Sequence, residues 1–147
     1  MNLRIMKWNK TWEADSTLSS LIQLRRDVFV TEQQCPIDDE PDANDPDALH
    51  VCAMINGVVV GCARILIKDP GVAKIGRVAV SREARKTGVG LAVMRMAILY
   101  TRSLGYEKIY LESQTHAIPF YERLGFVAYG PEFDDCNIPH RKMTLEL

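Results

Sequence analysis

The chain has 147 residues, of which 47% are hydrophobic and 25% are charged, and its net charge at pH 7 is -1. This length corresponds to one ordinary domain, and this balance is typical of a soluble globular protein. The absence of a basic excess argues against a nucleic-acid partner, and the slight acidity argues against an anionic membrane partner. No stretch is apolar enough for a transmembrane helix, and the first thirty residues lack a targeting pattern. We therefore expect one domain over residues 1–147, acting in the cytoplasm.

The first part of the chain predicts a strand followed by a helix. Residues 3–12 should form the strand, and Asp15 or Ser16 should cap the helix. Residues 25–27 should face away from the apolar side of this helix or lie at its edge, and the helix should end near residues 30–34. Its apolar stripe is formed by residues at helical spacing, namely Leu18, Leu21, Ile22, Val28 and Phe29.

Residues 36–49 predict an irregular loop. The segment holds three prolines and six acidic residues, and prolines and like charges at this density resist regular structure. We interpret its acids as solvated. The alternative is that they attract a cationic amine by electrostatic focusing.

The middle of the chain predicts a hairpin, a strand and a long helix. Asn56-Gly57 separates the apolar runs 50–55 and 58–67, which indicates a tight β-hairpin because both turn residues need positive φ. Residues 74–80 should form a further strand. The helix expected at residues 89–104 is apolar almost all round, so it should be buried against a sheet.

The last part of the chain predicts three strands and a short helix. Residues 108–113 should form a strand, and residues 116–124 the helix. Strands at 126–130 and 141–147 should follow, joined by a loop at 131–140. The complete order is β-α-β-β-β-α-β-α-β-β. The strands at 74–80 and 108–113 are joined through the long helix. A connection of this length is a crossover, so these two strands should be parallel.

The cysteine pattern indicates neither a metal site nor a disulfide framework. None of the four cysteines forms a Cys-x-x-Cys pair or lies at metal-binding spacing from a histidine. Cys52 and Cys62 lie in apolar runs, where cysteine acts as a small hydrophobic residue. We expect all four residues, which include Cys35 and Cys136, to be free thiols in a reducing compartment.

Residues 85–90 (Arg-Lys-Thr-Gly-Val-Gly) lie between a predicted strand and the start of the long helix. The first turn of a helix offers free backbone N–H groups and the positive end of the helix dipole, which suit a phosphate or pyrophosphate. Gly88 and Gly90 allow close approach to the backbone, and Arg85 and Lys86 add positive charge. The segment matches neither a Walker A loop nor the G-x-G-x-x-G fingerprint. The alternative interpretation is an ordinary turn before a capped helix.

Two longer stretches make this segment more specific. Residues 75–80 (I-G-R-V-A-V), followed by R-x-x-G-x-G, resemble the acetyl-CoA signature of the GNAT superfamily of N-acetyltransferases. Residues 117–126, which end in Y-x-x-L-G-F, resemble the second signature of that superfamily. The order and separation of the two signatures, and the element order over essentially the whole chain, agree with the family. Finer features resemble its ElaA-like branch, at residues 25–33, the acidic loop, 114–121 and 138–140.

The resemblance implies an α/β, GNAT-like fold with a mixed, mostly antiparallel sheet, a central parallel strand pair and flanking helices. It also implies acetyl-CoA as co-substrate and no metal. Backbone groups of Val78 and Val80 would pair with the pantetheine arm, with the Val78 N–H as a donor to the thioester oxygen. Gln114 stands where many members carry an asparagine. The residues expected at the cofactor are Val78, Ala79, Val80, Arg85, Lys86, Thr87, Gly88, Val89, Gly90, Leu91, Gln114, Phe120 and Tyr121.

The family's reaction is a direct attack of an amine on the thioester carbonyl in a ternary complex. Tyr121 matches the position of the general acid that protonates the leaving thiolate, and an unperturbed phenol, with a pKa of about 10, keeps its proton at neutral pH. The alternative role for Tyr121 is a core residue that anchors its helix. The base that deprotonates the amine is open among Glu32, His140, His50, Glu112 and a water chain.

The sequence is therefore interpreted as an acetyl-CoA-dependent N-acetyltransferase acting on a primary amine of a small molecule. Two alternatives stay open: a non-catalytic acyl-CoA sensor on the same fold, and an acetyltransferase for protein lysines or N-termini. The expected partner is a small-molecule amine, with neither nucleic acid nor membrane. Homodimer formation is left open.

Overall fold

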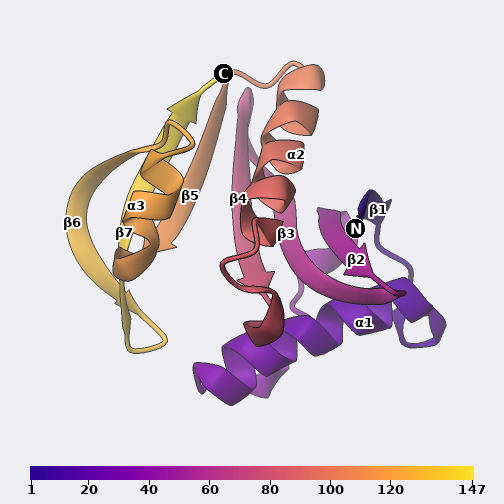
Figure 1. Cartoon of the computed structure of the whole chain (residues 1–147). Helices are drawn as coiled ribbons and strands as arrows, with labels where there is room; N and C mark the ends of the chain where they lie inside the picture. The colour runs from indigo at the N-terminus through magenta and orange to yellow at the C-terminus, as the bar shows by residue number, and fades with distance from the viewer.

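The protein forms one seven-stranded sheet of order β1-β2-β3-β4-β5-β7-β6 in a computed structural model that describes residues 1–147. All neighbouring strands are antiparallel except β4 and β5, which are parallel (Figure 1). The α/β fold with a mixed sheet and one parallel pair is thus confirmed. The strands are β1 (Asn2–Lys7), β2 (Leu49–Ile55), β3 (Val58–Asp69), β4 (Val72–Val80), β5 (Lys108–Gln114), β6 (Val127–Asp135) and β7 (Ile138–Glu146).

Helices cover both faces of the sheet. Val51 and Ala53 in β2 pack in the core cluster that contains the buried residues of α2 (Val89–Ser103), whereas Cys52 between them packs with α1 (Ser16–Arg25). Because successive strand residues point to opposite faces, α1 and α2 lie on opposite sides of the sheet. The short helix α3 (Ile118–Glu122) lies on the α2 side, since its Tyr121 joins the α2 cluster. No helix has both the length and the apolar character needed to cross a membrane.

The first helix begins as predicted but continues differently. The Asp15 carboxylate accepts hydrogen bonds of 3.0 Å from the backbone N–H groups of Thr17 and Leu18, which makes Asp15 the N-cap. After Arg25 the chain continues as the π-helix η2 (Arg26–Glu32). The expectation that Arg25 lies at the edge or faces away is wrong, because its side chain is only 1% exposed.

Three of the six acids in the loop are paired with arginines instead of being solvated, which corrects the expectation for Glu40, Asp42 and Asp45. Arg25 pairs with both Glu40 and Asp45, and Arg64 of β3 pairs with Asp42 at 2.7 Å and with Asp45 at 3.2 Å. Glu40 is 2% exposed, and Asp45 is fully buried. The physical reason is that a buried arginine requires a carboxylate partner, and this loop supplies the partners for the arginines beneath it. Glu40, Asp42 and Asp45 are therefore internal counter-charges, whereas Asp38, Asp39 and Asp47 are exposed as expected.

Two hairpins differ in how well the sequence predicts them. Asn56-Gly57 joins β2 and β3 with φ of 51° and 77°, as expected. The loop expected at residues 131–140 is instead a continuous β6–β7 hairpin that turns at Cys136-Asn137, where both φ values are positive. Because β6 is an edge strand and its register shifts between Tyr129 and Phe133, Pro131 is tolerated there.

Two of the four cysteines are paired, which corrects the expectation of four free thiols. Cys35 and Cys136 form a disulfide with their Cα atoms 5.8 Å apart, whereas Cys52 and Cys62 are buried free thiols. The paired residues are separated by 101 positions, and only the fold brings the segment after η2 next to the β6–β7 turn.

Candidate active site

The candidate active site begins where β4 and β5 part. Only residues 72–74 of β4 pair with residues 108–110 of β5, and both strands then continue without pairing with each other. Figure 1 shows the two strands diverging beyond this short contact. The β5-facing backbone groups of β4 therefore lack a strand partner up to Val80. An extended, amide-containing ligand can pair with such an edge as an added strand.

A break in the β3–β4 register accompanies the divergence. Cys62 and Arg64 of β3 pair with Ala79 and Gly76 of β4, so one β3 residue faces two β4 residues. The extra residue is Arg77, which has a left-handed φ of 50°. Such a β-bulge bends the strand that carries it. The bulge lies within the part of β4 that no longer pairs with β5, three residues beyond Lys74.

The start of α2 lies beside the end of β4 and offers an anion site. Gly88 is the N-cap, with φ of 90° and no side-chain cap, and the first helical hydrogen bond runs from Ala92 N to Gly88 O at 3.0 Å. The N–H groups of Val89, Gly90 and Leu91 consequently have no acceptor within the helix. Uncapped N–H groups at the positive end of a helix dipole bind phosphate oxygens.

The loop before α2 is fixed by its own contacts. Arg85 donates to the Val80 carbonyl at 3.1 Å and pairs with Glu32 at 2.7 Å. A Cβ on Gly90 would lie 3.3 Å from Val80 and 3.7 Å from Phe120, so Gly90 allows the helix start to approach both residues. The anion site is thus held directly against the unpaired end of β4.

Tyr121 lies on the α2 side of the sheet. It is 8% exposed and makes edge-on contacts with the rings of Phe120 and Phe126. Its hydroxyl makes no hydrogen bond within the chain, and burial raises the pKa of the phenol. Tyr121 therefore keeps its proton over the physiological range and has a free donor.

A polar cluster lies on the α1 side of the same strands. Gln114, at the end of β5, donates to Gln33 at 3.0 Å, and its Oε1 is 2.8 Å from His116 Nε2. His140 of β7 is the direct cross-strand partner of Gln114 and shares its face. His140 Nδ1 lies 2.7 Å from the Ile138 carbonyl, so Nδ1 carries the proton and Nε2 is left with a free lone pair.

The other candidate bases are held by structural partners. Glu32 pairs with Arg85 and Arg82, and the hydrogen bond from Arg85 lowers the pKa of this carboxyl. Burial lowers the pKa of His50, whose Nε2 lies 3.0 Å from the Asp45 carbonyl. Glu112 forms an ion pair of 3.1 Å with Lys74. Each of these three groups is therefore held by an ion pair or a hydrogen bond to another part of the chain.

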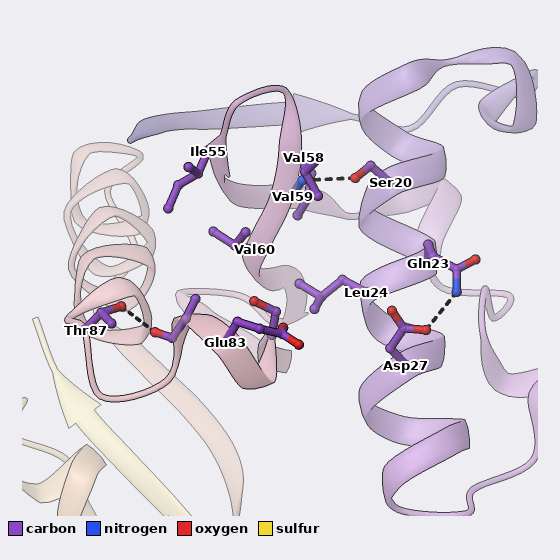
Figure 2. A pocket seen from close by; sticks show the side chains of 12 residues that line it. Ser20, Gln23, Leu24, Asp27, Ile55, Val58, Val59, Val60, Glu83 and Thr87 are labelled. Carbon is purple, nitrogen blue, oxygen red and sulfur yellow. Dashed lines mark hydrogen bonds between the residues drawn. The ribbon is translucent and has the colours of Figure 1, made fainter.

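A separate cavity of about 490 Å³ lies between α1, the β2–β3 turn and the segment before α2. Figure 2 shows Thr87 and Glu83 on one side of it, with Leu24 and Asp27 on the other. Tyr121 does not line this cavity. The cavity therefore adjoins the loop before α2, but it is distinct from the gap between β4 and β5.

The unpaired edge of β4 and the uncapped start of α2 together could accommodate a ligand with an extended amide-containing arm joined to a pyrophosphate. Coenzyme A is such a ligand. The fold and the site thus define the class of acyl-CoA-dependent transferases, and comparison with known proteins gives the family. The model for the acetyltransferase (GNAT) family matches residues 18–126, and the chain belongs to this family.

Similar proteins agree with this assignment. Protein ElaA of Escherichia coli (strain K12) is 35% identical over 90% of this chain and 89% of its own length. The crystal structure of Escherichia coli ElaA has a TM-score of 0.84 at 31% identity, with 97% of each chain covered. An acyl-CoA N-acyltransferase from Pseudomonas aeruginosa has a TM-score of 0.83 at 33% identity, with the same coverage. The predicted GNAT, ElaA-like acetyltransferase is thereby confirmed.

Sequence reasoning missed two residues near this site. The sequence places Gln33 at the end of the first helix and in the ElaA-like stretch, but it does not show that this side chain meets Gln114 across 81 positions. Arg77 was seen only as a letter in a signature, although its φ is left-handed. A long-range contact leaves no local signal, and an arginine in this conformation is uncommon. Neither residue could be found from periodicity.

Proposed function

We propose that the protein transfers an acetyl group from acetyl-CoA to the primary amine of a small molecule. The observation that carries this proposal is the unpaired edge of β4 directly beside the uncapped start of α2. A coenzyme A thioester along this edge would place its pyrophosphate at residues 86–91 and its pantetheine arm along Val78, Ala79 and Val80. Arg85 would add positive charge at the pyrophosphate end.

The chemical step is a direct attack of the amine nitrogen on the thioester carbonyl. A C–N bond forms, and the carbonyl oxygen becomes an oxyanion that the Val78 N–H would stabilise. The C–S bond then breaks as the oxyanion collapses. No acyl-enzyme is required, because the amine attacks the thioester carbonyl directly while both substrates are bound.

Tyr121 would protonate the leaving thiolate from the α2 side. Its phenol is buried, protonated and without another hydrogen-bond partner. The burial that raises the pKa of the phenol also makes a neighbouring thiolate more basic, because both anions lose solvation. Proton transfer between the two therefore remains favourable enough to assist departure of the thiol.

His140 would take the proton of the amine from the α1 side. Its Nδ1 contacts the Ile138 carbonyl, so Nε2 is the nitrogen that would take the proton, and the proposal has the acceptor approach from the face that His140 shares with Gln114. Glu32, the other candidate, is already bound to Arg85. This gives the acid and the base separate faces of the sheet, so that neither competes for the same proton.

A turnover experiment tests the proposed function. Purified protein is incubated with acetyl-CoA and a panel of small primary amines, peptides with free N-termini and lysine-containing peptides, and thiol release and acetylated product are measured. The proposal predicts thiol release with at least one small amine, with stoichiometric acetylated product. Cofactor binding without thiol release on any amine would instead indicate a sensor. Turnover restricted to the peptides would replace the small-molecule acceptor with a protein.

A further inference from the structure

Arg77 has a backbone conformation that its side chain does not favour. Its φ of 50° lies in the left-handed region. In this region the Cβ of an L-residue comes close to the following carbonyl oxygen, so that only glycine adopts it routinely. The residue before it, Gly76, is a glycine without positive φ. The strain therefore falls on the arginine although a glycine is adjacent. Strain of this kind persists where surrounding contacts hold it, often near functional sites.

The acidic loop holds the Arg77 side chain. Arg77 Nε lies 2.7 Å from Glu40 Oε1, and Arg77 Nη2 lies 3.0 Å from Asp42 Oδ2. The guanidinium also lies 5.9 Å from the ring of Phe29 in η2. Nη2 donates a hydrogen bond to Asp42, which orients the planar group, whereas Nε contacts Glu40 as an ion pair without hydrogen-bond geometry.

The two carboxylates are themselves immobilised. Glu40 also pairs with Arg25, and Asp42 also pairs with Arg64 at 2.7 Å. The Asp42 backbone N–H donates to buried Asp45 at 2.8 Å. The clamp on Arg77 is thus anchored to α1 and β3, both of which have well-packed apolar sides. A clamp anchored in this way can hold a strained backbone.

The strained residue directly precedes Val78 and lies three residues beyond Lys74, the last β4 residue that pairs with β5. The bulge decides where the following peptide group points, because a left-handed residue rotates the next N–H relative to a regular strand. Without the bulge, β4 would keep the regular pairing that it has with β3 on either side. The direction of the Val78 N–H therefore depends on the conformation of Arg77.

We propose that Glu40 and Asp42 hold Arg77 in the left-handed bulge, and that Arg77 is thereby a positioning residue that directs the Val78 N–H toward the thioester carbonyl. This inference rests on the proposed function, in which Val78 donates to that oxygen. It gives the acidic loop a role in catalysis that acts through the backbone. For Glu40, Asp42 and Asp45, attraction of a cationic amine is a weaker role, because Arg25, Arg64 and Arg77 neutralise these three acids.

The test compares Arg77→Gly with Arg77→Ala. Both variants lose the ion pairs, but glycine accepts a φ of 50° whereas alanine resists it. The proposal predicts that Arg77→Ala lowers kcat roughly 10- to 100-fold with little change in the KM for acetyl-CoA, since a displaced oxyanion donor acts on the transition state. Arg77→Gly should retain clearly more of kcat than Arg77→Ala. Equal values of kcat in the two variants would overturn the proposal.

A second measurement does not require turnover. The amide signal of Val78 in ¹H–¹⁵N NMR spectra should move in Arg77→Ala and in Asp42→Asn, which removes a single partly exposed carboxylate and should leave the fold intact. Lys108→Ala, which removes an exposed ion pair with Glu146, is the matched control and should leave both kcat and the Val78 signal unchanged. Because a substitution at residue 77 shifts the amide signal of its neighbour in any case, Asp42→Asn decides the test: an unmoved Val78 signal in that variant would overturn the clamp. If the wild type acetylates no amine, the proposed function fails, and the NMR comparison still decides whether the clamp exists.

Discussion

At the scale of single residues, the acid and the base of the proposed reaction are set apart by the alternation of strand side chains. Gln114 and His140 lie on the α1 side of the strands, whereas Tyr121 packs with the α2 cluster on the other. Each group has one atom free: the hydroxyl of Tyr121 and Nε2 of His140. A carbonyl group placed between the two faces would meet a proton donor on one side and a proton acceptor on the other.

His140→Gln should lower kcat/KM at neutral pH by roughly 100-fold, because the base that deprotonates the ammonium is lost. The loss should shrink toward pH 10, where a larger fraction of the amine is already neutral. The measurement is kcat/KM from pH 6 to pH 10 for wild type and variant. A loss of equal size at every pH would show that His140 acts by structure alone. Glu32→Gln, as the comparison, should keep the pH dependence of the wild type.

At the scale of elements, the start of α2 depends on glycine for two different reasons. Gly88 has φ of 90°, but a Cβ at this position would have no neighbour within 4 Å, so its requirement is conformational. A Cβ on Gly90 would have neighbours at 3.3 Å and 3.7 Å, so its requirement is steric. Both requirements place the same three N–H groups where a pyrophosphate would bind.

Gly88→Ala should weaken acetyl-CoA binding roughly tenfold, since a strain of about 1–2 kcal/mol at the helix start turns the free N–H groups away from the phosphates. Titration calorimetry with acetyl-CoA measures this directly. Gly57→Ala is the matched control, because Gly57 also has positive φ and open space around it but lies in the β2–β3 turn. Weakening of equal size in the control variant would remove the pyrophosphate assignment.

The acidic loop makes stability depend on pH. Burial raises the pKa of Asp45, but the hydrogen bonds and charge of Arg25 outweigh burial and lower it from 3.8 to about 2. A carboxyl with a lowered folded pKa contributes stability above the unfolded pKa and loses it as the pH falls toward the folded pKa. We expect wild type to lose about 2 kcal/mol of unfolding free energy between pH 5 and pH 2 from this group.

Asp45→Asn provides the check by urea denaturation. This substitution should lower the free energy of unfolding by about 3–5 kcal/mol at pH 7, because the buried Arg25 is left with fewer counter-charges. The variant should then lose less stability than wild type on acidification, since the titrating group is gone. Equal acid losses in the two proteins would show that Asp45 does not carry the pH dependence.

At the scale of the whole molecule, local patterns predicted the elements, and long-range pairs escaped prediction. Asn56-Gly57 and the apolar α2 segment have signals that depend only on neighbouring residues, and both elements formed as expected. The two signature stretches likewise identified the family. By contrast, Arg25 belongs to a helix whose periodicity cannot show that Glu40 covers it. The proline and acidic residues at 131–140 indicate a loop. An edge strand tolerates them, but the sequence does not show that this segment lies at the edge of the sheet.

The disulfide is the longest of these unpredicted links, and it should contribute to stability. Cys35 and Cys136 close a loop across 101 positions, for which the chain-entropy account gives about 4.7 kcal/mol. Reductant should lower the unfolding free energy of the wild type by this amount and leave Cys136→Ser unaffected. Thiol titration of the unfolded, unreduced protein should find two thiols. Four titratable thiols would contradict the pairing.

The central claim is tested most directly by kcat and acetyl-CoA affinity in Tyr121→Phe. This substitution removes only the hydroxyl and keeps the ring that packs against Phe120 and Phe126. We expect kcat, measured by thiol release, to fall roughly 100- to 10,000-fold, because the phenol acts on the leaving thiolate. The Kd for acetyl-CoA should stay nearly unchanged. An unchanged kcat in this variant would contradict the account.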